Sequence, residues 1–137
     1  MKVLSLIEPW GTLIKEEKKL IETRSWKTNY RGTLYIHTSL KKVSKAVQDN
    51  KELMNLISNP NFKYGYIICK CELVDCIYMT EEFVKDIKNN NHQEYICGTY
   101  EVGRYAWILN NIEKIDPIKA KGKLGIWTYD KEKEEEK

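Results

Sequence analysis

The spacing of hydrophobic residues changes several times along the chain, and each spacing predicts one kind of element. Short apolar runs, or a strict alternation of apolar and polar residues, predict strands because successive side chains of a strand point to opposite faces. Such patterns occur at residues 3–7, 20–26, 32–39, 65–78, 104–115 and 123–129. Apolar residues spaced three and four positions apart predict helices. They occur at residues 9–17, 40–58 and 80–88.

The order of these elements predicts an α+β protein rather than a nucleotide-binding α/β fold. Strands and helices do not alternate regularly, and the sequence contains neither G-x-G-x-x-G nor G-x₄-G-K-[ST], so phosphate-binding glycine loops are not indicated. The segment TNYRG between strands 20–26 and 32–39 is typical of a turn, and we expect these two strands to form a hairpin. The architecture that fits best is a small mixed sheet or β-barrel with flanking helices.

Charged residues are concentrated around the second predicted strand, in the stretch KKLIETRSW at residues 18–26. Alternation places Glu22, Arg24 and Trp26 on one face of that strand, directly after Lys19. Two interpretations fit this spacing. One is an exposed ion pair that contributes about 0.5 kcal/mol, and the other is a recessed polar site with an aromatic wall.

Composition and charge limit the class of protein. The 137 residues fit one domain, and 42% hydrophobic with 31% charged residues is ordinary for a globular chain. Residues 130–137 hold five acids and three lysines, a block typical of a disordered tail, which leaves residues 1–129 as the folded domain. Without that block the net charge rises from +3 to +5. Such a mildly basic body permits nucleic-acid binding without establishing it.

Four cysteines, at positions 69, 71, 76 and 97, raise the question of a metal site or a disulfide. Cys69 and Cys71 alternate within a predicted strand, unlike the C-x₂-C to C-x₄-C spacing of zinc ligands. The alternation places both on one apolar face. We therefore expect buried, reduced thiols, and neither a metal nor another cofactor.

The opening stretch MKVLSLIEPW indicates a cytoplasmic protein. Its apolar run is too short for a signal-peptide core, Glu8 interrupts it, and no small-residue cleavage site follows. No stretch of the sequence approaches the roughly 20 apolar residues of a membrane helix. We therefore expect no membrane association.

Three separated blocks follow one another in a recognisable order: LSLIEPWGTLIKEEKKLIETRSWKTNYRGTLYIHTS, then GRYAWIL, then KGKLGIW. This order resembles the ASCH domain family, a branch of the PUA-like superfold, and the resemblance extends to about Trp127. The signature of the family is G-x-K-x-x-E-x-R, which Lys19, Glu22 and Arg24 match. Glu17 stands where the family usually has glycine, at the turn out of the first helix.

The resemblance implies a PUA-like barrel of five to six strands whose cleft binds RNA or a (modified) nucleotide. In such a cleft cations hold phosphate, rings stack on a base, and a carboxylate accepts a hydrogen bond from an exocyclic amine. Some of the aromatic candidates lie in apolar runs, which is also the usual position of core residues. The candidate binding residues are Trp10, Lys19, Glu22, Arg24, Trp26, His37, Tyr105 and Trp107.

Two other functions stay open. The resemblance also allows an enzyme. In that case Lys19, Glu22 and His37 would be its catalytic residues, acting without a metal on RNA or on an N4-acylated cytidine. The related branch that deacylates N4-acetylcytidine has a threonine three residues after its lysine, where this chain has Glu22, which argues against the same mechanism. Alternatively, the same groove of a protein-interaction module would bind an acidic peptide.

Overall fold

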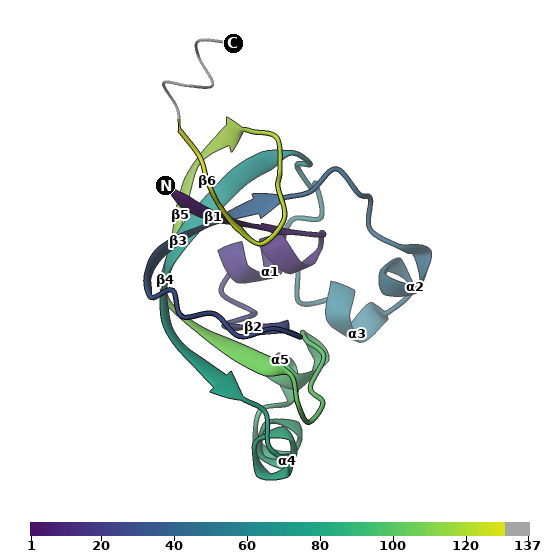
Figure 1. Ribbon diagram of the computed structural model, residues 1–137. Helices are drawn as coiled ribbons and strands as arrows, with labels where there is room; N and C mark the ends of the chain where they lie inside the picture. The colour runs from purple at the N-terminus through teal and green to yellow at the C-terminus, as the bar shows by residue number, and fades with distance from the viewer. Residues whose placement is uncertain (131–137) are drawn as a thin grey trace.

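The computed structural model describes residues 1–130 and has six strands and five helices in that range (Figure 1). Residues 131–137, on which most of the predicted acidic tail falls, lie outside the described residues. The elements in chain order are β1 (Lys2–Leu6), α1 (Trp10–Lys15), β2 (Ile21–Arg24), β3 (Gly32–Thr38), α2 (Lys45–Gln48), α3 (Lys51–Met54), β4 (Tyr66–Tyr78), α4 (Glu81–Asn90), α5 (His92–Ile96), β5 (Tyr105–Lys119) and β6 (Ile126–Thr128).

The strands form one mixed sheet in the order β2-β5-β4-β3-β1-β6, in which β1 and β3 are parallel and the other pairs antiparallel. The long strands β4 and β5 curve around α1 (Figure 1). Three register shifts along this pair, between residues 67 and 75, account for the curvature because a bulge bends a strand and increases its twist. The result is a curled half-barrel with helices beside it, which confirms the predicted α+β, PUA-like class.

The predicted hairpin of residues 20–26 and 32–39 is wrong. β2 pairs with β5, and β3 pairs with β1 and β4, so two strands lie between β2 and β3. Three strand spacings amount to roughly 14 Å, and the seven residues from 25 to 31 can span up to about 23 Å. The link is therefore long enough to cross β5 and β4.

The single helix predicted for residues 40–58 is also wrong, because the structure has the two short helices α2 and α3. Each has its own N-cap: the side chain of Ser44 accepts from Val47 N, and that of Asn50 accepts from Leu53 N, both at 3.2 Å. Serine and asparagine prefer such caps to a helix interior. The helical spacing was therefore right, but the capping residue Asn50 divides it.

Helix α4 confirms its prediction, since the Thr80 side chain accepts from Phe83 N as an N-cap. The short helix α5 was not predicted. It follows at once in the segment NNNHQEYI, where the side chain of Asn91 caps it and where the apolar residues are too few for a clear spacing.

The main core lies between α1 and the concave face of the sheet. Ile14 of α1 packs there with Cys69 and Cys71 of β4, and these residues are 0–1% exposed. Burial raises the pKa of Cys69, and it raises that of Cys71 to about 12. The predicted buried thiols are confirmed for these two and for Cys97, while Cys76 is half-buried, and all four are unbridged. None of the helices in residues 1–130 is both long and apolar enough to cross a bilayer.

Candidate functional site

The turn that connects α1 to β2 has the geometry of a Schellman C-cap. Lys18 N donates to Leu13 O and Glu17 N to Ile14 O, both at 2.9 Å, and Glu17 itself has a φ of 58°. This is the left-handed conformation that favours glycine at the position after a helix. The turn thus forms although Glu17 occupies the position where the family signature has glycine.

Lys19 follows this turn and is buried, with 1% of its surface exposed. Its Nζ donates to Ile21 O at 2.7 Å and to Cys97 O at 2.6 Å, and it lies 3.5 Å from the carboxylate of Glu22. An ammonium group has three donors, and three acceptors of the protein surround this one. Nζ also lies 5.8 Å from the centroid of the Trp10 ring. Lys19 therefore joins β2 to the segment after α5.

Glu22 and Arg24 form the second part of the site, side by side on β2. The Nε of Arg24 donates to Glu22 Oε2 at 2.9 Å, and its Nη2 donates to Ser5 O of β1 at 3.2 Å. The Glu22 side chain is 9% exposed and that of Arg24 is 25% exposed. Two anchors thus fix the guanidinium plane, while its remaining N–H groups have no hydrogen bond to the described residues. A fixed guanidinium with free donors suits phosphate or carboxylate recognition.

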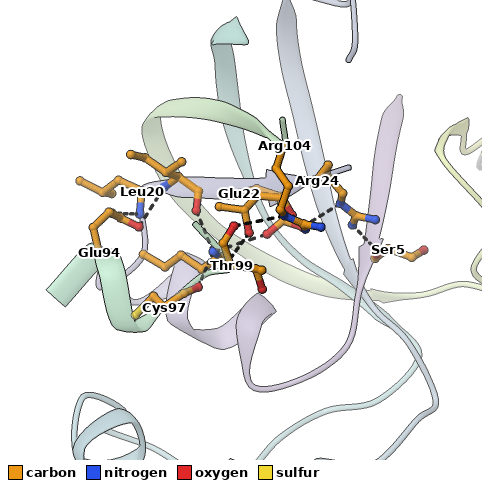
Figure 2. Close-up of polar contacts among 11 residues, drawn as sticks. Ser5, Leu20, Glu22, Arg24, Glu94, Cys97, Thr99 and Arg104 are labelled. Carbon is orange, nitrogen blue, oxygen red and sulfur yellow. Dashed lines mark hydrogen bonds and ion pairs between the residues drawn. The ribbon is translucent and has the colours of Figure 1, made fainter. Parts of the chain in front are cut away.

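Glu94 of α5 holds the other end of β2. Its carboxylate accepts from Leu20 N at 2.7 Å and from Ile21 N at 3.2 Å, and the residue is 4% exposed. Burial raises the pKa of Glu94, against the opposing effects of these hydrogen bonds and of the Lys19 charge. Figure 2 shows the resulting row of polar groups from Glu94 through Glu22 to Arg24 and Ser5.

Above this row lies a cleft of about 380 Å³, which we call the Arg24 cleft. Its lining comes from the end of β1 at residues 5–7, from Trp10, from residues 22–26 and from Arg104. Arg104 donates to Thr99 O at 3.2 Å and to Thr23 O at 3.4 Å, and it lies next to Glu22 and Arg24 (Figure 2). The cleft therefore contains two arginines, one carboxylate and two tryptophans.

Four of the predicted site residues line the Arg24 cleft: Trp10, Glu22, Arg24 and Trp26. Lys19 lies behind Glu22, out of the lining. Trp107 is 0% exposed and packs edge-on against Trp26 with ring centroids 4.8 Å apart, so it supports the wall from the core. Tyr105 is half-buried and packs against Tyr78, at a centroid distance of 5.6 Å.

His37 lies on the other side of the end of β1. Its Nε2 donates to Ala120 O at 2.7 Å, because a carbonyl oxygen can only accept. In the neutral ring the proton therefore lies on Nε2, and Nδ1 accepts from Ser5 Oγ at 2.9 Å. Ser5 Oγ in turn accepts from Trp127 Nε1 at 3.0 Å. Burial lowers the pKa of His37, more than the bond to Ala120 raises it. Both ring nitrogens of this neutral imidazole are thus engaged with the protein.

Sequence reasoning missed two residues of the site, Glu94 and Arg104. Arg104 had a signal, because it is the second residue of the GRYAWIL block and precedes a strand that alternates cleanly. Glu94 had none, since its position in a short, irregularly spaced segment says nothing about the two N–H groups it binds. Among residues 1–130, no three His, Cys, Asp or Glu residues are grouped as metal ligands.

The curled mixed sheet around α1, with the polar row along β2, defines an α+β protein of the PUA-like class. Within that class the chain belongs to the ASCH domain family, whose family model matches residues 4–120. It resembles the crystal structure of ASCH from Zymomonas mobilis, with a TM-score of 0.58 over 98% of this chain and 90% of that one. A mutant of the same protein gives 0.57 over 98% and 94%. Both are 15% identical to this chain and show the fold alone.

The chain is also similar to the human and mouse proteins named Activating signal cointegrator 1. It is 26% identical to the human protein and 25% identical to the mouse protein, in each case over 138 residues and 93% of this chain. The chain spans only 22% of the length of these curated relatives.

Proposed function

We propose that this domain binds single-stranded RNA, or a nucleotide of it, in the Arg24 cleft. The observation that carries the proposal is the fixed guanidinium of Arg24, which Glu22 and Ser5 O hold while its other donors stay free. A phosphate oxygen pair matches these donors. Fixing the side chain in advance reduces the entropy that binding would cost.

The walls of the cleft suit a base next to that phosphate. Trp26 is 38% exposed, and its edge contact with Trp107 keeps the ring in place. Stacking of a base on an aromatic ring contributes about 1–3 kcal/mol. Arg104 adds a second cation at the same cleft. The carboxylate of Glu22 is engaged with Lys19 and Arg24, so its proposed part is to orient Arg24 rather than to read the base.

Binding is favoured over hydrolysis because of what the candidate catalytic groups already contact. The donors of Lys19 Nζ face two carbonyls and Glu22, and both nitrogens of His37 are engaged. A nucleophile or general base needs a free lone pair within reach of the substrate. Neither Lys19 nor His37 lies in the lining of the Arg24 cleft.

Fluorescence anisotropy with a 5′-fluorescein-labelled hexaadenylate RNA tests the proposal. Trp26→Ala should weaken binding by about 5- to 150-fold, the loss of one stacked base, and it leaves the Trp26 carbonyl that accepts from Trp107 Nε1 in place. Arg104→Gln should weaken binding as well. Arg31→Gln is the matched control, since this exposed arginine pairs weakly with Asp75 away from the cleft.

Equal affinity of all these variants would remove the Arg24 cleft as the binding site. The same RNA and N4-acetylcytidine should also be incubated with the protein and their products separated by chromatography. Turnover that disappears in Lys19→Ala would replace binding with the hydrolase alternative. Binding of an acidic peptide that the RNA does not displace would favour the protein-interaction module.

A further inference from the structure

We propose that the ligand of this domain is an oligonucleotide strand, whose further nucleotides lie in a second groove beyond Arg24. This inference rests on the proposed function and adds to it the length and path of the ligand. The second groove, which we call the loop groove, has a volume of about 810 Å³. It is lined by Lys119 at the end of β5 and the loop 120–125 that follows, and by residues 5–7, 24, 37, 39, 40, 64 and 65.

The loop groove and the Arg24 cleft adjoin each other. Both are lined by Ser5, Leu6 and Ile7 at the end of β1, and both are lined by Arg24. A ligand phosphate held at Arg24 therefore has one nucleotide on the side of Trp26 and the next on the side of the loop. The two grooves together exceed the space that a single nucleotide would occupy.

The charge of the loop groove matches the phosphates of such a strand. Lys119, Lys121 and Lys123 line it and are exposed, and Arg24 adds a fourth cation. No aspartate or glutamate of residues 1–130 contributes to its lining. Spacing by two residues places the lysines along one short segment, as successive phosphates require.

The lining of the loop groove includes two exposed apolar side chains. Leu40 and Leu124 are 75% and 98% exposed, an unusual degree for leucine. The faces of bases and the carbon atoms of riboses offer matching apolar surface to such side chains.

The loop that carries the lysines is tethered. Ala120 N donates to Gly65 O at 3.0 Å, and Ala120 O accepts from His37. Gly122 passes so close to His37 that an added Cβ would lie 2.8 Å from the Cε1 atom of the ring. His37 thus positions the loop, although it lines the groove rather than the Arg24 cleft. A tethered loop loses little entropy when a strand binds to it.

The test compares one nucleotide with several. Affinities of AMP, of the hexaadenylate RNA and of the DNA hexamer of the same sequence are measured by calorimetry or anisotropy at several salt concentrations. The variant K119Q/K121Q/K123Q removes the cations of the loop groove. Its charge-matched control is K51Q/K85Q/K88Q, which changes three exposed lysines on α3 and α4.

We expect the loop variant to weaken hexamer binding at least tenfold and to lower the slope of log K against log salt by about 2, at roughly 0.7 per phosphate contact. Its affinity for AMP and the hexamer affinity of the control variant should stay within about twofold of the unchanged protein. If the DNA hexamer binds more weakly than the RNA hexamer, part of the recognition falls on the ribose hydroxyl. If the two hexamers bind equally well, recognition falls on phosphates and bases. Both results agree with the inference.

The inference fails if the loop variant binds the hexamer with unchanged affinity and salt slope while Trp26→Ala still weakens it. That result leaves the proposed function in place. The inference also fails if AMP binds as tightly as the hexamer. If the unchanged protein binds neither AMP nor the hexamers, the proposed function fails together with it. The loop variant could also bind an acidic peptide more weakly while its affinity for the hexamer is unchanged. That result would assign the groove to protein partners and overturn the inference.

Discussion

Replacing Lys19 by methionine separates a structural part of the signature lysine from a chemical one. Lys19 is 1% exposed, and its ammonium group contacts Ile21 O, Cys97 O and the carboxylate of Glu22. Methionine fills a similar volume but donates no hydrogen bond. It therefore leaves two buried carbonyls and one buried carboxylate without this partner, and the folded state loses stability.

The expected loss is about 3 kcal/mol. Leaving a buried acceptor without its donor costs about 1–3 kcal/mol, and removing one member of a buried ion pair costs about 3–5 kcal/mol. The lower end applies because Glu22 keeps its bond of 2.9 Å to Arg24. A domain with a stability of about 5–15 kcal/mol remains folded after such a loss.

Urea unfolding followed by tryptophan fluorescence measures this difference. The control is Lys18→Met, expected to lie within about 0.5 kcal/mol of the unchanged protein, because the Lys18 side chain has no hydrogen bond to the described residues. The double variant Lys19→Met with Glu22→Gln should lose about 1–3 kcal/mol less than the sum of the two single losses. A loss below about 1 kcal/mol for Lys19→Met, or strict additivity, would refute the reasoning and make Lys19 a candidate for reactivity again.

Three further substitutions test neighbouring features. Glu17→Gly should raise the free energy of unfolding by about 0.5–1 kcal/mol by relieving the left-handed backbone at φ 58°; a lower melting temperature would contradict this. Burial lowers the pKa of His37 below 6.5 in the folded protein. As the pH falls, His37 therefore becomes protonated in the unfolded chain before it does in the folded one, and stability should fall from about pH 6.5 down through the folded pKa. His37→Gln should reduce that slope in urea titrations, and an identical slope would speak against it. Gly122→Ala should cost about 1–3 kcal/mol, since its methyl would meet His37 at 2.8 Å; an unchanged melting temperature would show that the loop moves away freely.

Only those features of the candidate site that depend on neighbouring residues in the chain could be predicted from the sequence. Alternation in β2 places Glu22 and Arg24 on one face, and both line one cleft. Trp26 lines the same cleft, but it lies beyond the end of the strand. Alternation does not reveal that Lys19 is buried. Two of the acceptors around its ammonium group are the carbonyl oxygens of Ile21 and of Cys97, and Cys97 is 78 residues away in the chain. His37 illustrates the same limit. Its hydrogen bond to Ala120 spans 83 residues and takes it away from the cleft that the family resemblance implied.

By itself the sequence determined the local features of this protein: the faces of its strands, the Thr80 cap of α4, and the family signature at Lys19, Glu22 and Arg24. These depend on backbone geometry and on neighbours within a few residues. Only the tertiary structure decided that β2 pairs with β5 instead of β3, and that Glu94 and Arg104 join the polar row. The physical reason is that strand hydrogen bonds are alike for every possible partner. Burial and charge pairing therefore depend on which distant segments the curled sheet brings together.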